Sequence, residues 1–372
     1  MGTVWKHISW SLKWLALGKW PTEDAAGVKF ETGEHAEKAG TDLAEGFHVC
    51  LLALLGDLEY FALSLHLEHF GSLSPCLLCQ CNKSDRPWTD VRHDVGVWKT
   101  SMWTSATAWL AHLREVHPLF RLPGVSILNV MPDLLHCKHL GSDSWFYGSV
   151  MTLLTHHIME GDPDTNLERI WEEIKAVYQE RKITDQYTGM TVGMYHKTNS
   201  FPRLKGRAAE ILHFVEPLMV VFRKYMSRES QPHRQILMAL EASAEMERIL
   251  DDHVGDYVLP DEAHQQYWKA TFEFLALATA VSTYYHGNVG CLFNFTIKFH
   301  LLAHIAFYAK YFNPRLAWCY SGEDFMQKIK KIVGSCQRGT SPCLVATKAV
   351  GKYASGLAFV AMESDVWLDS LL

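Results

Sequence analysis

The region between residues 100 and 290 most constrains the fold, because it repeatedly spaces apolar residues three and four positions apart. That spacing places apolar side chains on one face of an α-helix, which must be buried against a neighbouring element. The clearest segments are TSATAWLAHLREV, SVMTLLTHHIM, NLERIWEEIKAVYQERK, RAAEILHFVEPLMVVFRKYM and QILMALEASAEMERILDDHV. We therefore predict a block of packed helices over 100–290.

Composition indicates a globular chain without the usual charge of a nucleic-acid-binding protein. The 372 residues are 48% hydrophobic, which is enough for a sizeable core. The net charge is −6, whereas nucleic-acid-binding domains usually carry a basic face, so any DNA contact would be local. The nine cysteines and the lack of a secretion-type N-terminus favour reduced thiols that are available to a metal.

The longest stretch free of Asp, Glu, Lys and Arg runs from Phe274 to Ile297. Histidine, glycine and asparagine interrupt it, a pattern more typical of a buried helix pair than of a membrane span. We therefore expect no membrane association.

A short apolar run, FHVCLLALL at 47–55, precedes Gly56 and Asp57. Such a run predicts a buried β-strand that delivers a carboxylate at its end, and helical spacing resumes directly after it. The sequence thus predicts an α/β core interrupted by a large, mainly α-helical insertion. The expected regions are an irregular remnant at 1–45, a strand, helix and cysteine loop at 46–99, the helical insertion at 100–290, and a C-terminal helical region at 291–372.

Two distant pairs of residues have the spacing of zinc ligands. Cys76 and Cys79 form a CxxC pair, and His300 and His304 lie one helical turn apart. Together they would make a Cys2His2 zinc site that joins two ends of the fold. Taken by spacing alone, buried core histidines and an incidental CxxC remain the alternative.

Asp57 and Glu323 are the candidate catalytic carboxylates. One follows the predicted strand and the other begins the helix after Ser321, and phosphodiester chemistry on two Mg²⁺ or Mn²⁺ ions needs convergent carboxylates of this kind. An acid in a first helical turn is also favoured by the helix dipole alone, which offers a purely structural explanation of Glu323.

The segment MPDLLHCKH at 131–139 concentrates side chains that can bind metal. Asp133 and His136 could belong to a further metal site, to a DNA-contacting corner, or to a capped helix start. A catalytic zinc held by Asp133, His136 and His139 would instead indicate an unrelated metal hydrolase.

The order of these motifs resembles the DDE transposases of the CACTA, Mirage and Chapaev group and the related V(D)J recombinase core. The resemblance implies an RNase H-like catalytic domain with a helical insertion, in which Asp133 and His136 match an Asp/Cys-x-x-His motif. It also implies a structural zinc, magnesium-dependent DNA strand transfer, nuclear localisation, and transposon ends or a second copy of the chain as partners. The residues carried over are Asp57 and Glu323 as catalytic acids and Cys76, Cys79, His300 and His304 as zinc ligands.

The chain departs from that family at its first catalytic aspartate. Only Asp24 and Asp42 precede Asp57, and neither follows a strand-like run. We therefore expect a catalytically incomplete transposase-like fragment. The alternative is a domesticated, zinc-stabilised helical module that binds protein or DNA without catalysis.

Overall fold

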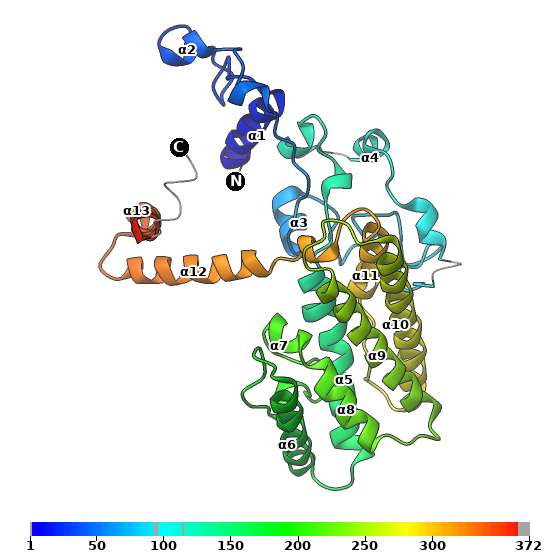
Figure 1. Cartoon of the computed structure of the whole chain (residues 1–372). Helices are drawn as coiled ribbons and strands as arrows, with labels where there is room; N and C mark the ends of the chain where they lie inside the picture. Colours follow the sequence, from blue (N-terminus) through cyan, green and yellow to red (C-terminus); the bar gives the residue numbers. More distant parts are fainter. Residues whose placement is uncertain (1, 93–95, 114, 364–372) are drawn as a thin grey trace. The chain divides into compact units, whose positions relative to one another are not determined.

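The computed structural model of the chain describes residues 2–92, 96–113 and 115–363 (Figure 1). These residues form helices and loops, with isolated β-bridges and no β-strand. The predicted α/β, RNase H-like core is therefore wrong, whereas the predicted helical character of 100–290 agrees with the structure. The chain divides into two compact units, Met1–Trp318 and Cys319–Leu372.

The segment at 47–55 shows why the strand prediction fails. It is extended, but among the described residues its pairing is limited to a single parallel bridge between Leu54 and Val130. Phe47 and Leu52 are 75% and 64% exposed, so the run is not a buried strand. A strand is stabilised by cross-strand neighbours, and an apolar run alone does not provide them.

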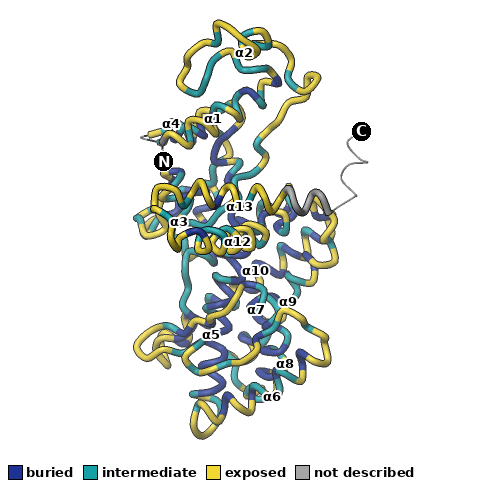
Figure 2. Tube along the Cα trace, turned by 90° about the vertical axis from the view of Figure 1, so that its left-hand side faces the viewer, coloured by how far each residue is buried: buried dark blue, intermediate teal, exposed yellow. Residues whose placement is uncertain are grey.

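The first unit is built mainly from α-helices. Buried residues concentrate in α5 and in the helices packed around it, among which α9 and α10 lie side by side (Figures 1 and 2). The α-helices of this unit are α1 (Gly2–Leu17), α2 (Glu34–Lys38), α3 (Leu58–Leu65), α4 (Ala106–His112), α5 (Ser144–Leu153), α6 (Pro163–Arg181), α7 (Ala208–Leu212), α8 (Val215–Tyr225), α9 (Gln231–Asp252), α10 (Asp261–Asn288) and α11 (Ile297–Tyr308).

Local sequence explains where several helices begin and end. The Asp162 side chain accepts a hydrogen bond from the Thr165 backbone, and Pro163 occupies the first turn, where its missing N–H has no cost. The same helix, α6, ends at Lys182 in the left-handed conformation. Ser230 caps α9 in the same way as Asp162 caps α6.

A π-helical segment, η5 (Leu135–Asp143), leads directly into α5. At Gly141 its backbone leaves helical values, with φ −110° and ψ −110°. Further along, Gly148 lies so close to the 203–204 backbone that an added Cβ would meet the Leu204 nitrogen at 2.5 Å. This close approach fixes the 203–204 loop against α5.

The second unit contains α12 (Tyr320–Gln337) and α13 (Pro342–Glu363). Cys319 is the N-cap of α12, so the helix begins before Ser321, and Asp324 pairs with Lys328 one turn later. Within the part of the chain that the structure describes, no helix is long and apolar enough to cross a membrane.

Candidate metal centre

Three cysteines from one loop meet one face of α11. Cys76, Cys79 and Cys81 are all buried, as are His300 and His304 one turn apart in α11. The loop is held by backbone pairing with 101–103, in which the Gln80 N–H donates to Ser101 and the Trp103 N–H donates to Leu78. The chain thus brings together side chains that lie more than 200 positions apart.

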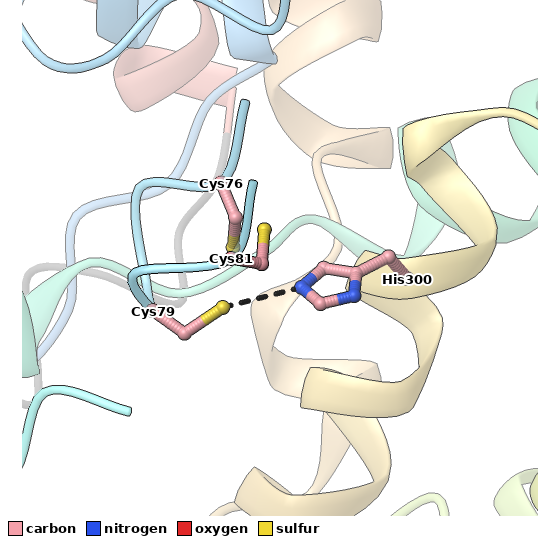
Figure 3. A group of neighbouring side chains, drawn as sticks. All are labelled: Cys76, Cys79, Cys81 and His300. Atoms are coloured by element: carbon pink, nitrogen blue, oxygen red, sulfur yellow. Dashed lines mark hydrogen bonds between the residues drawn. The ribbon is translucent and has the colours of Figure 1, made fainter. Parts of the chain in front are cut away.

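The distances fit a metal site. The Cys79 sulfur lies 3.3 Å from Nε2 of His300, and the Cys76 sulfur lies 3.5 Å from Nε2 of His304 (Figure 3 shows the first contact). A tetrahedral zinc ion with Zn–S of about 2.3 Å and Zn–N of about 2.0–2.1 Å would space sulfur and nitrogen about 3.6 Å apart. The donor atoms of Cys76, Cys79, Cys81 and His300 all lie within 4.8 Å of one another, so this cluster could hold a metal ion such as zinc.

Neighbouring groups orient the donors. The Leu78 backbone N–H points at the Cys76 sulfur at 3.3 Å, a contact that stabilises a thiolate. Nδ1 of His300 lies 3.0 Å from the Trp88 carbonyl, so an N–H there leaves the lone pair of Nε2 facing the thiols. The buried Trp98 ring packs against both histidines, with centroids 4.4 Å from His300 and 4.8 Å from His304. Apolar walls and an oriented imidazole are typical of a metal ligand shell.

The electrostatics of the thiols also favour a bound cation. Burial raises the pKa of the Cys76 and Cys79 thiols, whereas hydrogen bonds from these two lower the pKa of Cys81. Without a cation, three adjacent thiolates would repel one another in a buried space. A divalent metal removes that repulsion, because it binds thiolates and compensates their charge.

Five donors compete for four positions, and Cys81 was not among the predicted ligands. Its signal in the sequence is the CxxCxC spacing of residues 76–81. Nδ1 of His304 is buried without a hydrogen-bond partner among the described residues. If Nε2 of His304 bound metal, Nδ1 would carry an unsatisfied proton, at a cost of about 1–3 kcal/mol. If Nε2 instead donates to the Cys76 sulfur, Nδ1 carries only a lone pair.

The predicted catalytic acids have different surroundings from those expected. Asp57 follows no strand; it caps α3, and its carboxylate accepts the Tyr60 backbone N–H at 2.6 Å. Glu323 lies in the first turn of α12, in the second unit. Among the described residues, no group of three close metal-binding donors contains either acid, so the expected Mg²⁺ or Mn²⁺ site has no support.

Asp133 and His136 line the same pocket as Asp57. Asp133 accepts the Leu135 N–H at 3.0 Å and contacts Nδ1 of His136, so its side chain acts in part as a local helix cap. The structure therefore brings the DxxH segment close to one predicted acid.

His139 belongs to a different cluster. Its Nε2 lies 3.0 Å from Glu247, in a buried network where the Lys138 ammonium contacts Glu247 at 2.7 Å and Asp143 at 2.8 Å. His139, Asp143 and Glu247 have a geometry that could hold a metal ion. The lysine already supplies the positive charge between the two carboxylates, and it leaves no comparable need for a cation. A hydrolase centre on Asp133, His136 and His139 is not formed.

Comparison with protein-family models, with curated proteins and with solved structures found no match to this chain.

Proposed function

We propose that this chain is a zinc-stabilised helical module that binds a protein partner and carries out no strand transfer. The observation that supports it is the buried cluster of Cys76, Cys79, Cys81 and His300, which joins a cysteine loop to α11. A site with four protein ligands is closed to substrate and has a structural role.

In this proposal the three thiolates and Nε2 of His300 hold the ion, and His304 donates a hydrogen bond to Cys76. A bound zinc supplies charge neutralisation and a cross-link, and no reaction step. The cysteine loop buries Leu77 and Leu78 in the apolar core, and the link through zinc adds to this packing where the loop meets α11.

Two observations favour binding over catalysis. The described residues contain no sheet on which catalytic carboxylates could converge, and Asp57 is engaged as a helix cap. The net charge of −6 disfavours an extended DNA-binding face and suits a protein partner.

A second candidate is the catalytically incomplete transposase-like fragment. It is favoured by one observation, that the CxxC and HxxxH pairs on which the resemblance rests lie in contact. DNA binding separates the two candidates, because the fragment is expected to bind duplex DNA in a salt-sensitive way and the module is not. Neither candidate is expected to nick supercoiled plasmid with Mg²⁺ or Mn²⁺, so nicking that is abolished by Asp57→Ala would contradict both.

Zinc analysis of the purified chain tests the main proposal. We expect about one zinc per chain in the wild type, and loss of that zinc in His300→Ala. A matched control replaces the exposed Cys50 and Cys291 by serine and should retain the metal. Wild-type protein without zinc, or zinc retained in His300→Ala, would contradict the proposal.

Band-shift measurements at low salt test the choice of partner. A protein-binding module shows no DNA affinity even when ionic screening is weakest. Tight, salt-sensitive binding to duplex DNA would reject the protein-binding assignment while leaving the zinc site intact.

A further inference from the structure

A pocket of about 370 Å³ lies beside α3, η5 and the start of α11. This is a size at which proteins bind small molecules. Most of its wall is apolar, and the polar groups are few and charged. The apolar side chains of the wall include Phe61, Phe70, Leu77, Trp145, Ile297 and Leu301.

Two cationic side chains that line the pocket, Arg203 and Lys298, converge on one backbone oxygen. The carbonyl of Leu140 accepts from the Arg203 guanidinium at 3.1 Å and from the Lys298 ammonium at 3.3 Å. Leu140 immediately precedes the kink at Gly141, where an added Cβ would lie 3.0 Å from the Lys298 side chain. The π-helical kink and the absence of a side chain at Gly141 thus make room for Lys298.

The charges of Asp57 and Asp133 attract the Lys298 ammonium, but at longer range than an ion pair. Among the described residues, Arg203 and Lys298 form no ion pair with a carboxylate, and the remaining bond of Arg203 is to the Ser144 hydroxyl at 3.3 Å. Three carboxylates also line the pocket. Glu59 is exposed to solvent, whereas Asp57 and Asp133 direct carboxylate oxygens at the backbone N–H groups of Tyr60 and Leu135.

Arg203 and Lys298 also have more N–H donors than the Leu140 carbonyl can accept. A carbonyl oxygen offers two lone pairs, whereas guanidinium carries five N–H donors and ammonium three. With two Arg203 bonds and one Lys298 bond formed, both side chains retain further N–H donors. Arg203 is exposed and Lys298 is half-buried, so an anion in the pocket can accept those donors in place of water.

We propose that this pocket binds a small organic anion, with a phosphate or carboxylate head held by Arg203 and Lys298 and an apolar body among the aromatic side chains. Arginine suits this task because its planar fork binds phosphate or carboxylate through two parallel hydrogen bonds. The guanidinium also lies 5.3 Å from the centre of the Trp145 ring, so one aromatic wall lies next to the anionic head. The assignment goes beyond the zinc module, and the zinc site can be intact whether or not the anion binds.

Isothermal titration calorimetry with phenyl phosphate tests the pocket. We expect binding to the zinc-loaded wild type and a loss of affinity of about tenfold or more in Arg203→Met, because a charge-assisted pair is removed. Arg169→Met is the matched control, since Arg169 is exposed on α6, and it should bind like the wild type. Lys298→Met is a second variant, accompanied by a zinc assay because Lys298 lies two residues before His300.

Titration with benzyl alcohol and with inorganic phosphate separates the contributions of the apolar body and the anionic head of the ligand to affinity. Both should bind more weakly than phenyl phosphate. Equal affinity of Arg203→Met and the wild type for phenyl phosphate, or benzyl alcohol binding as tightly as phenyl phosphate, would overturn the proposal. A short oligodeoxynucleotide that displaces phenyl phosphate at lower concentration would assign the head group to a phosphodiester backbone and would overturn the small-molecule assignment.

Discussion

Cys81 and His304 are alternative fourth ligands, and single substitutions distinguish them. In Cys81→Ser the Cys3His shell loses a thiolate, so we expect most zinc to be lost in competition with a chromophoric chelator. In His304→Ala a hydrogen bond to Cys76 and the packing of the ring against Trp98 are removed but no metal ligand is, and loss of such a supporting group weakens metal affinity by about 10–100-fold. Cys50→Ser is the control. The opposite ranking of the two variants would establish the Cys2His2 shell that the spacing predicts.

Lys138 is a second residue whose role can be isolated. Burial alone lowers the pKa of Lys138, but attraction to Asp143 and Glu247 outweighs burial and leaves the pKa raised. Lys138→Met therefore leaves two buried carboxylates without their counter-charge, and we expect a loss of about 3–5 kcal/mol in urea unfolding. The exposed Lys269→Met should change stability by no more than about 0.5 kcal/mol.

The pH dependence of that loss follows from the direction of the shift. A raised pKa means that the contribution of Lys138 to stability is fully present below its unfolded value of about 10.4 and disappears as pH rises through the folded value. The wild type and Lys138→Met should therefore differ at neutral pH and converge only in strong alkali. A constant difference across that range would show that the lysine acts through packing and not through its charge.

At the scale of elements, the contact between α5 and the 203–204 loop is the most sensitive to a small change. A methyl group at Gly148 would meet the Leu204 nitrogen at 2.5 Å and Cα of Arg203 at 2.7 Å, and backbone atoms cannot move aside cheaply. We expect Gly148→Ala to lower stability by about 1–3 kcal/mol, as overpacking does. Gly287→Ala, in α10 with open space around it, should be neutral or stabilising by up to about 1 kcal/mol. Equal melting temperatures for the two variants would contradict this account.

Some of these elements could be predicted from the sequence and others could not. Spacing of three and four indicated the helices of 100–290 because each helix buries a stripe that the sequence itself records. The run at 47–55 misled, since its apolar residues remain partly exposed and a strand depends on a partner that no local pattern specifies. The π-helical η5 has no known spacing signal, and neither does the close approach at Gly148.

For the metal centre, the sequence predicted some of the donor residues that the structure brings together. The CxxC and HxxxH pairs were recognisable because each pair can bind one ion by itself. Their contact across the fold gives this pairing geometric support. Cys81 was missed because a third cysteine at CxxCxC adds no separate half-site. The roles of Asp57 and Glu323 stay a prediction, since an isolated acid carries no spacing that distinguishes a metal ligand from a helix cap.

At the scale of the molecule, two kinds of contact hold the first unit together: apolar packing and the contacts of the metal ligands. The α5, α8, α9 and α10 helices bury a continuous apolar core that also includes Leu77 and Leu78, whereas the thiols of the 76–81 loop meet α11 at His300, whose ring packs against Trp98. Metal removal should therefore act locally, because only the second kind depends on the ion. Hydrogen exchange read by mass spectrometry can resolve this difference by segment.

We expect chelation to increase backbone exchange in 76–92, in 96–103 and at the start of α11, while α9 and α10 keep their protection. Once the cation is gone, the three thiolates repel one another or take up protons. The helix core, by contrast, loses no apolar contact. The Cys50→Ser and Cys291→Ser variant, treated with the same chelator, should behave like the wild type. If exchange instead rises uniformly in all helices, the ion stabilises the whole first unit, and the cysteine loop is part of its cooperative core and not an attachment to it.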